Sequence, residues 1–437
     1  MLRKIISSGV LLFATSLAVQ TKSLAQTPAD TGIILIRTSR LFDSEHGSML
    51  EGMDILVRRG VIDSVGASIK PPRGARIIDL SKFTVLPGLI DAHTHLLYLE
   101  QPTQGAAFDN VKTLVMDGTA SRALHAAARA RTFLAAGITT VRDLGNSGRF
   151  GDVALRDAIR DGSVDGPRMF VSGPGLSPVG GQLPGLRPEW AGIAEDEYRI
   201  VHSPDDAADA VRENVTFGAQ LIKVYSNNTP NPAFLSLEEL RAIVAAAQRL
   251  GVRVAAHATD DASVWRAAEA GVTSVEHAYE VSDSTLALMA RKGVFLVATD
   301  LDSLSAIRYA ERAGMTGDRA GLMSFLKSER ARLRRAVAAG VPIAAGSDNY
   351  IDMQWPQGEA ARRVLFAYQQ TGLTPVQILQ AATINDARLL GQEGRLGVLK
   401  AGAFADLIAV EGNPLTDFSA LERIRFVMKN GTVYVGR

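Results

Sequence analysis

Leu86-Pro87-Gly88-Leu89-Ile90-Asp91-Ala92-His93-Thr94-His95 is the stretch that decides the fold, an apolar run that ends in an acidic residue and two histidines. On a β-strand, His93 and His95 point to the same face because successive side chains alternate between faces. In a barrel of parallel strands that face is the interior, so both imidazoles can bind one metal ion. Histidine pairs are often only polar surface, but this pair follows a run that has no reason to be exposed.

Four further potential ligands lie within or just after short apolar runs. Lys223 lies inside Leu-Ile-Lys-Val-Tyr, His257 and His277 end two successive runs, and Asp348 follows Ile-Ala-Ala-Gly-Ser. Alone, either histidine is more readily explained as a structural residue, but the shared position at successive strand ends favours metal binding. Imidazoles and carboxylates are the ligands that borderline metals such as zinc take. If these runs are parallel barrel strands, the six groups converge on one face of the barrel.

The middle of the chain alternates between strand-like and helix-like segments. The expected strands are residues 84–90, 139–143, 168–172, 220–224, 252–257, 273–277, 294–298 and 341–345. Segments with helical periodicity separate them, for example residues 120–136, 204–217, 237–250 and 322–339, and several end at a glycine. This pattern predicts an α/β protein with a (β/α)8 TIM barrel. The alternative is a doubly wound open sheet, which would not gather these ligands at one point.

Both ends of the chain read as β-structure. Residues 33–37, 54–58, 61–65 and 76–80 at one end, and 405–410, 425–429 and 432–435 at the other, are short β-branched runs. Asn430-Gly431 is a hairpin signal. We therefore expect residues 26–85 and 396–437 to form one small β-sandwich domain, and residues 86–395 to form the barrel.

The first 25 residues read as an export signal. Arg3 and Lys4 precede a mostly apolar run over residues 5–19, and Ser23-Leu24-Ala25 offers a small-x-small cleavage site. The alternative is a membrane anchor, but the run is shorter than the ~20 apolar residues that span a bilayer. We predict an exported protein, periplasmic or secreted, that begins near Gln26 and has no membrane partner after cleavage.

Composition excludes several classes of partner and chemistry. Lys and Arg number 47 against 46 Asp and Glu, and no basic stripe indicates a nucleic-acid partner. The chain has no cysteine, which excludes disulfides, thiolate ligands and a cysteine nucleophile. The sequence leaves the oligomeric state open, a homo-oligomer included.

Lys223 and Asp348 carry the most specific expectations. A buried lysine has a lowered pKa and becomes a neutral amine, which can add carbon dioxide to form a carbamate that bridges two cations. The alternative is a lysine that reaches solvent or an acid. Asp348 is either a helix N-cap or a ligand that also carries protons. Glu276 should point away from His277 on a regular strand and support the site from behind.

Two further residues and one loop are candidates for substrate binding. Tyr225 lies on the same strand face as Lys223 and could hydrogen-bond the substrate, or it could simply pack at the barrel mouth. Arg142 could bind a substrate carboxylate or serve as a structural ion-pair partner. The Gly- and Pro-rich residues 173–191 form either a disordered surface insertion or a wall of the substrate site.

Taken together, these motifs resemble the amidohydrolase superfamily over nearly all of the chain after the signal. The matching motifs are the Leu86–His95 stretch, Gly137-Ile138-Thr139-Thr140-Val141-Arg142-Asp143, Lys223, His257, His277, Gly346-Ser347-Asp348 and Gly402-Ala403-Phe404-Ala405-Asp406-Leu407. The resemblance implies two divalent ions, with zinc as the expected metal. It assigns His93 and His95 to the first ion, His257 and His277 to the second, and a carboxylated Lys223 to the bridge. Asp348 would bind the first ion and shuttle protons.

Within the superfamily, the chain is most similar to the exported dipeptidases and carboxypeptidases labelled imidazolonepropionase-like or Xaa-Pro dipeptidase. Imidazolonepropionases use one metal and lack the bridging lysine, so Lys223 argues against that activity. Relatives often carry a histidine after Gly-Gly in the loop after the third strand, whereas here Gly180-Gly181 is followed by Gln182.

The resemblance therefore implies hydrolysis of an amide bond in a short peptide or N-acyl amino acid. The expected mechanism is attack by a hydroxide that bridges the two ions, with Asp348 as the proton carrier. The alternatives are a lactone, ester or other C–N hydrolase of the same superfamily, or a non-catalytic binding barrel. The intact ligand set argues against the binding barrel, which would not need Asp348.

Overall fold

The computed structural model describes residues 32–100, 111, 113–183, 185–228, 231–314 and 318–436. The predicted signal over residues 1–25 lies outside this part of the chain. Within the described residues, no helix combines the length and apolar character needed to cross a bilayer.

Eight parallel strands form the barrel, and they agree with the predicted strand order. They are β6 (Leu89–Thr94), β7 (Ile138–Asp143), β8 (Arg168–Val171), β11 (Leu221–Tyr225), β14 (Arg253–Ala258), β15 (Ser274–His277), β16 (Phe295–Val297) and β17 (Ile343–Ala344). The ladder has two seams, because β6-β7-β8 is one sheet and β11-β14-β15-β16-β17 belongs to another. Isolated backbone bonds connect the sheets at these two places. Gln220 N donates to Val171 O at 2.8 Å between β8 and β11, and Ala92 N donates to Ala345 O at 2.8 Å between β6 and β17.

The first barrel strand starts later than predicted. Residues 84–87 belong to β5 (Arg76–Pro87), which pairs with β18 (Leu407–Val410) of the small domain, and β6 begins only at Leu89. The cause is the Pro87-Gly88 pair, since proline ends the ladder and glycine permits a close approach. A Cβ on Gly88 would lie 2.1 Å from Thr139 Oγ1. The chain therefore passes from one sheet to the other at this pair.

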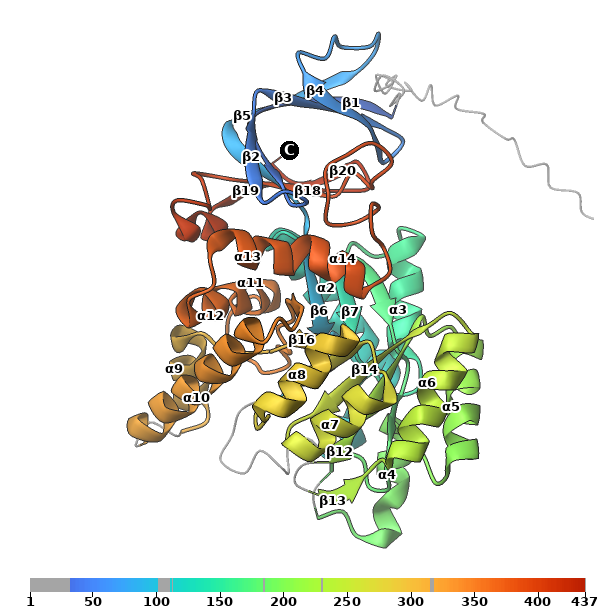
Figure 1. The fold of residues 1–437 in the computed structure, drawn as a ribbon. Helices are drawn as coiled ribbons and strands as arrows, with labels where there is room; N and C mark the ends of the chain where they lie inside the picture. Colours follow the sequence, from blue (N-terminus) through green and yellow to red (C-terminus); the bar gives the residue numbers. More distant parts are fainter. Residues whose placement is uncertain are drawn as a thin grey trace, which may run out of the picture. The chain divides into compact units, whose positions relative to one another are not determined.

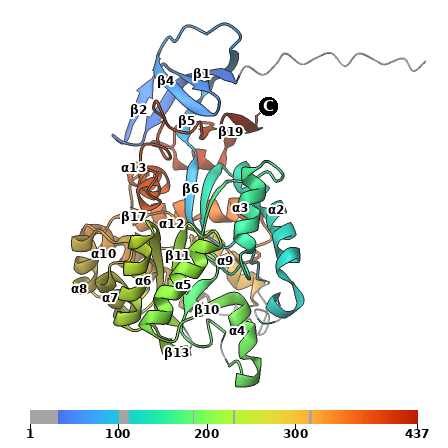
Figure 2. The same ribbon diagram turned by 90° about the vertical axis from the view of Figure 1, so that its right-hand side faces the viewer.

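Helices surround the strands (Figure 1, Figure 2). They are α2 (Thr119–Ala135), α3 (Gly151–Arg160), α4 (Ala191–Glu197), α5 (Pro204–Thr216), α6 (Leu237–Arg249), α7 (Asp261–Ala270), α8 (Asp283–Lys292), α9 (Ser303–Arg312), α10 (Arg319–Ala338), α11 (Gln357–Arg362), α12 (Val364–Thr371), α13 (Pro375–Gln380) and α14 (Asp386–Leu389). Local sequence fixes several boundaries. Ser236 and Glu239 form a capping box at the start of α6, and Gly271 ends α7 with φ 89°.

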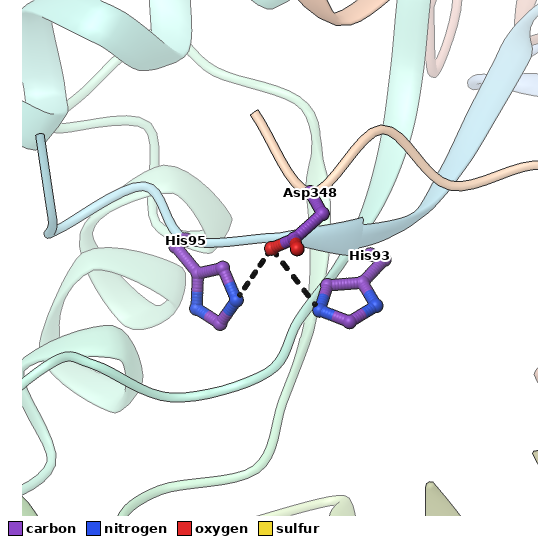
Figure 3. Close-up of side chains that lie close together, drawn as sticks. All are labelled: His93, His95 and Asp348. Carbon is purple, nitrogen blue, oxygen red and sulfur yellow. Dashed lines mark ion pairs between the residues drawn. The ribbon is translucent and has the colours of Figure 1, made fainter. Parts of the chain in front are cut away.

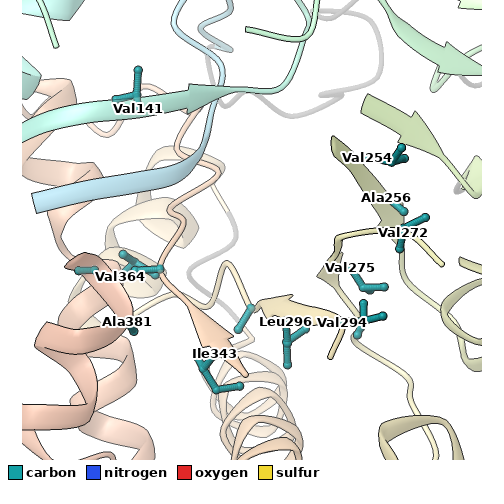
Figure 4. Packing of buried hydrophobic residues seen from close by; sticks show 14 of the residues in the cluster. Val141, Val254, Ala256, Val272, Val275, Val294, Leu296, Ile343, Val364 and Ala381 are labelled. Atoms are coloured by element: carbon teal, nitrogen blue, oxygen red, sulfur yellow. The ribbon is translucent and has the colours of Figure 1, made fainter. Parts of the chain in front are cut away.

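The main apolar core lies between the barrel strands and these helices. On β14, Val254, Ala256 and Ala258 belong to this core, whereas His257 faces the barrel interior. Figure 4 shows Val254 and Ala256 with Val275 of β15 and Leu296 of β16 in the same cluster. Each fully buried large apolar side chain stabilises the fold by about 1.5–3 kcal/mol. The alternation on each strand thus separates a packing face from a chemical face.

The small β domain combines both chain ends in one sheet. Its strands are β1 (Ile33–Asp43), β2 (Ser48–Glu51), β3 (Met53–Arg58), β4 (Val61–Ala67), β5, β18, β19 (Ile424–Lys429) and β20 (Thr432–Val435). The order is β20-β19-β18-β5-β1-β3-β4, with β2 beside β1, so β5 joins the two halves (Figure 1). Apolar residues from both halves, such as Ile36 and Leu407, share one core. The residue limits of the two domains stay predictions, and β5 runs through the expected boundary at residue 85.

The Gly- and Pro-rich residues 173–191 take a defined course in the described part. Strand β9 (Gly175–Ser177) pairs with β10 (Tyr198–Ile200) and touches β11, and a short 3-10 helix covers Pro188–Trp190. A Cβ on Gly175 would lie 2.6 Å from the Tyr225 ring, so only glycine lets β9 approach β11 this closely. The loop therefore forms a wall beside the barrel mouth.

Candidate metal centre

All six predicted ligands line a single cavity of about 590 Å³ at the carboxyl ends of the barrel strands. His93 lies on β6 with His95 just beyond it, Lys223 is on β11, and His277 ends β15. The other two are His257, on β14, and Asp348, after β17. Lys223 and His257 share the interior face because their strand neighbours pack outward against the helices. The structure thus brings together the residues that the sequence singled out, while metal binding by them stays a prediction.

His93, His95 and Asp348 form the tightest group (Figure 3). Asp348 Oδ1 lies 3.4 Å from His93 Nε2 and 3.1 Å from His95 Nε2. One potential ligand atom from each residue lies within 4.8 Å of the other two, a spacing that suits a shared ion. His277 adjoins this group, since its ring centroid is 5.2 Å from that of His93.

Three of the four histidines have Nδ1 engaged by a fixed partner. His93 Nδ1 lies 2.8 Å from Glu276 Oε2, His95 Nδ1 lies 2.9 Å from Gly145 O, and His277 Nδ1 lies 2.8 Å from Thr299 Oγ1. An acceptor at Nδ1 favours the tautomer whose Nε2 carries a lone pair toward the cavity. These partners therefore orient the rings for metal binding at Nε2. Glu276 has the supporting role that its strand position indicated.

His257 has a different partner. Its ring centroid lies 4.7 Å from that of His277, and its Nε2 lies 3.1 Å from Gln182 Nε2. A carboxamide N–H can only donate, so it binds the lone pair of His257. Gln182 stands at the loop position where relatives often carry histidine, and the structure places it against a predicted ligand.

Burial sets the protonation of the group. Burial, followed by the charge of Lys223, lowers the pKa of His257 to about 3 and the pKa of His93 well below its ordinary value. Burial alone would raise the pKa of Asp348, but His93, His95 and Lys223 together hold that pKa below its usual range. Burial opposes protonation of His95 too, but its hydrogen bond to Asp348 and the charge of that carboxylate raise the pKa of this imidazole. Metals bind the neutral imidazole and the ionised carboxylate. The donor set therefore fits a divalent ion.

Lys223 is buried as predicted, with a side chain only 1% exposed. Burial lowers the pKa of its ammonium to about 8, against the opposing charges of Glu276 and Asp348. The alternative in which Lys223 reaches solvent does not hold in this structure. A pKa near neutrality supplies the free amine that carbamate formation requires.

Two of the candidate ligands sit on strained backbone. His277 has φ 73° and Asp348 has φ 49°, the left-handed region that costs non-glycine residues about 1–3 kcal/mol. Asp348 N donates to His93 O at 2.8 Å, which fixes one ligand against another. A Cβ on Gly346 would lie 2.7 Å from His93 Cβ, so the Gly-Ser-Asp motif needs its glycine. Asp348 is not a helix N-cap, because the next helix, α11, begins at Gln357.

The two predicted substrate contacts have different outcomes. Tyr225 lines the cavity, and its hydroxyl donates to Asn146 Oδ1 at 3.3 Å. Arg142 does not line it: its guanidinium donates to Ala92 O, to Ser274 Oγ at 2.9 Å and to Glu276 Oε1 at 2.8 Å. The contacts of Arg142 therefore match the alternative of a structural ion pair. They do not match a direct role in binding substrate at this cavity.

Sequence reasoning missed most of the aromatic lining. Tyr98, Tyr198, Tyr279 and Tyr350 join Tyr225 around the cavity. Tyr279 and Tyr350 each stand two residues after a predicted ligand, and this spacing could have identified them. Tyr98 and Tyr198 reach the cavity from segments without a motif, so only the fold reveals them.

Comparison with known proteins identifies the family. The model of the amidohydrolase family matches residues 84–434. The chain belongs to the amidohydrolase family. Ochratoxinase of Aspergillus niger is 28% identical over 458 residues, which cover 96% of this chain and 91% of that protein. Imidazolonepropionase of Deinococcus radiodurans is 28% identical over 413 residues, which cover 87% and 92%.

Solved structures agree with this assignment. A Xaa-Pro dipeptidase with methionine bound in its active site matches with a TM-score of 0.79 and 28% identity, over 92% of this chain and 100% of that one. The structure of A. niger ochratoxinase matches with a TM-score of 0.75 and 28% identity, over 93% and 96%. The predicted fold class, a TIM barrel with a β-sandwich, and the assignment as a hydrolase of this family are confirmed.

Proposed function

We propose that this amidohydrolase is an exported binuclear metal enzyme that cleaves the amide bond of a short peptide or N-acyl amino acid. The observation that carries the proposal is the convergence of six potential ligands on one cavity. Relatives named for dipeptides and for ochratoxin support the choice of an amide substrate. The export signal over residues 1–25 is part of the same proposal.

The proposal assigns two ions to this set of residues, of which His93, His95 and Asp348 lie close enough together to share one ion. His93, His95 and Asp348 would hold one, His257 and His277 would hold the other, and a carboxylated Lys223 would bridge them. Bound divalent ions supply Lewis acidity, which polarises a carbonyl and lowers the pKa of water. Zinc suits the imidazole and carboxylate donors.

Residues of the chain supply proton transfer and substrate binding. Asp348 is the proton carrier, since a carboxylate with a lowered pKa is ionised at neutral pH and its Oδ1 faces the centre of the site. The Tyr225 hydroxyl, held by Asn146, borders the space for substrate. Arg142 does not line this cavity, so Tyr225 and loop residues such as Gln182 would bind a substrate carboxylate.

The cavity size limits the substrate. A volume of about 590 Å³ lies within the range of about 300–1,000 Å³ that small-molecule sites occupy. Such a space accommodates a dipeptide or an acylated amino acid and excludes a folded polypeptide. Five tyrosine rings on its wall favour an amphipathic or aromatic substituent.

The test is a substrate screen with zinc-reconstituted enzyme. Dipeptides, N-acyl amino acids and matched esters and lactones are compared at equal concentration, with metal-stripped enzyme as the control. We expect amide turnover that needs metal and exceeds turnover by Asp348→Asn. Metal-independent turnover would overturn the mechanism, and activity confined to lactones or esters would overturn the amide assignment alone.

A further inference from the structure

A second cavity, of about 320 Å³, opens near the amino ends of the barrel strands. Leu221 and Arg253 are the first residues of β11 and β14, and both line it. Gly391 and Gln392, which follow α14, form another part of its wall. No predicted metal ligand lines this cavity, so it is separate from the site described above.

The charged side chains that line this amino-end cavity are both positive. Its charged side chains are Arg142 and Arg253, its polar side chains are the amides of Gln220 and Gln392, and no carboxylate lines it. The nearest acid along the chain, Glu393, lies outside the lining; it pairs with Arg388, with 3.7 Å between Arg388 Nε and Glu393 Oε1, and its charge also acts on Arg253. Arg142 is ion-paired with Glu276 at 2.8 Å, so Arg253 contributes most of the uncompensated positive charge of the lining.

Part of the Arg253 guanidinium lines this cavity. Its Nη1 donates to Arg388 O at 2.8 Å and to Leu389 O at 3.1 Å, which positions the group at the end of α14. Its Nε and Nη2 lie 3.0 Å from the position of a Cβ on Gly391, so the glycine leaves that edge of the guanidinium uncovered. An arginine edge with two N–H groups matches the two oxygens of a carboxylate or phosphate.

Arg142 supplies the second cation from inside the barrel. Its side chain is 4% exposed, and three of its donors bind Ala92 O, Ser274 and Glu276. A guanidinium has five N–H donors, so these three bonds do not use all of them. Glu276 in turn accepts from His93, and a short chain of hydrogen bonds therefore links the amino-end cavity to the candidate metal centre.

We propose that the amino-end cavity binds a small oxyanion, a carboxylate or a phosphate, between Arg253 and Arg142. Two cations, two carboxamide donors and an uncovered guanidinium edge supply the charge and the hydrogen bonds such an anion needs. The ligand also relieves the repulsion between the two guanidinium groups. The proposal concerns this cavity alone and does not depend on the reaction at the other end of the barrel.

The test is calorimetric titration of the full-length protein with inorganic phosphate and, separately, with succinate at low ionic strength. Wild type should bind one equivalent of at least one of them, with affinity that falls as salt is added. Arg253→Gln should weaken binding at least about tenfold, the loss of one charge-assisted bond. The matched control is Arg388→Gln, which removes an exposed arginine outside the cavity and should bind like wild type.

Arg253→Lys separates a binding role from a role in holding α14. Lysine keeps the positive charge but cannot form the bidentate hydrogen bond of a guanidinium, so the affinity for a carboxylate should fall more than the affinity for phosphate. Preference for succinate or for phosphate in wild type identifies the class of oxyanion. Absence of binding of both anions to wild type, or equal affinity in wild type and Arg253→Gln, would overturn the proposal. A fall in thermal stability that is identical with and without anion would assign Arg253 to the helix end only.

Discussion

The two ends of the barrel carry opposite chemistry. The cavity at the carboxyl ends of the strands gathers histidines, Lys223 and Asp348, whereas the amino-end cavity presents Arg142 and Arg253. The same strands serve both: β11 begins with Leu221 at one cavity and continues to Lys223 and Tyr225 at the other. Strand direction therefore separates a proposed metal-binding end from a proposed anion-binding end within one barrel. The Arg142–Glu276–His93 connection joins them.

The largest effect is expected at the carboxyl end. Asp348→Asn keeps the side-chain shape but removes the proton acceptor, and general acid–base groups contribute about 100- to 10,000-fold. We expect a loss of that order in kcat/KM with the fold retained, measured by steady-state kinetics and circular dichroism. Asp352→Asn, outside the cavity, is the matched control and should behave like wild type. Near-normal turnover by Asp348→Asn would assign proton transfer to another group.

The connection between the two ends should govern metal affinity. Glu276→Gln weakens the acceptor at His93 Nδ1, and loss of such a partner lowers metal affinity about 10- to 100-fold. Competition with a chelator measures the change. Thr299→Val is the companion variant, because it removes the partner of His277 and should weaken the other ion selectively. If both variants bind metal like wild type, these residues do not orient the ligands.

A smaller effect, on stability, is expected at Glu329 of α10. This carboxyl group is 5% exposed, and burial, followed by the charge of Asp300, raises its pKa to about 9. In the unfolded chain it titrates near pH 4.3. The folded state thus keeps a proton that the unfolded state releases, so the free energy of unfolding should fall as pH rises from about 4.3 to about 9.

Glu329→Gln stays neutral and should remove this part of the pH dependence. Denaturant unfolding at several pH values should show similar stability for variant and wild type near pH 4. Near pH 9 the variant should be more stable by several kcal/mol, the effective cost of burying a charged group. Parallel stability curves for the two proteins would show that Glu329 is already ionised at neutral pH.

The sequence predicted those features of the site that are local in the chain. His93, Lys223, His257 and His277 stand in or at the ends of apolar runs, and strand alternation places Lys223 and His257 on the interior face. His277 follows the outward-packed Val275 by two positions, so its left-handed backbone, and not alternation, turns it into the cavity. Asp348 was found through the small-residue run before it. Its left-handed backbone depends on the hydrogen bond to His93, a contact between strands far apart in sequence.

What the sequence could not predict depends on packing between distant segments. The Pro87-Gly88 break lies inside one apolar run, and only the pairing of β5 with β18 shows that the run belongs to two sheets. Arg142 has two plausible roles in the sequence, and its bond to Glu276, 134 positions away, decides between them. The contact between Gln182 and His257 likewise needs the folded loop.

Metal content tests the central claim most directly. Protein purified without chelators and with bicarbonate present should hold two divalent ions per chain by elemental analysis. Lys223→Ala removes the proposed bridge between the ions, so it should hold fewer and lose turnover in parallel. Two ions and normal turnover in Lys223→Ala, or a single ion in fully active wild type, would contradict the binuclear centre.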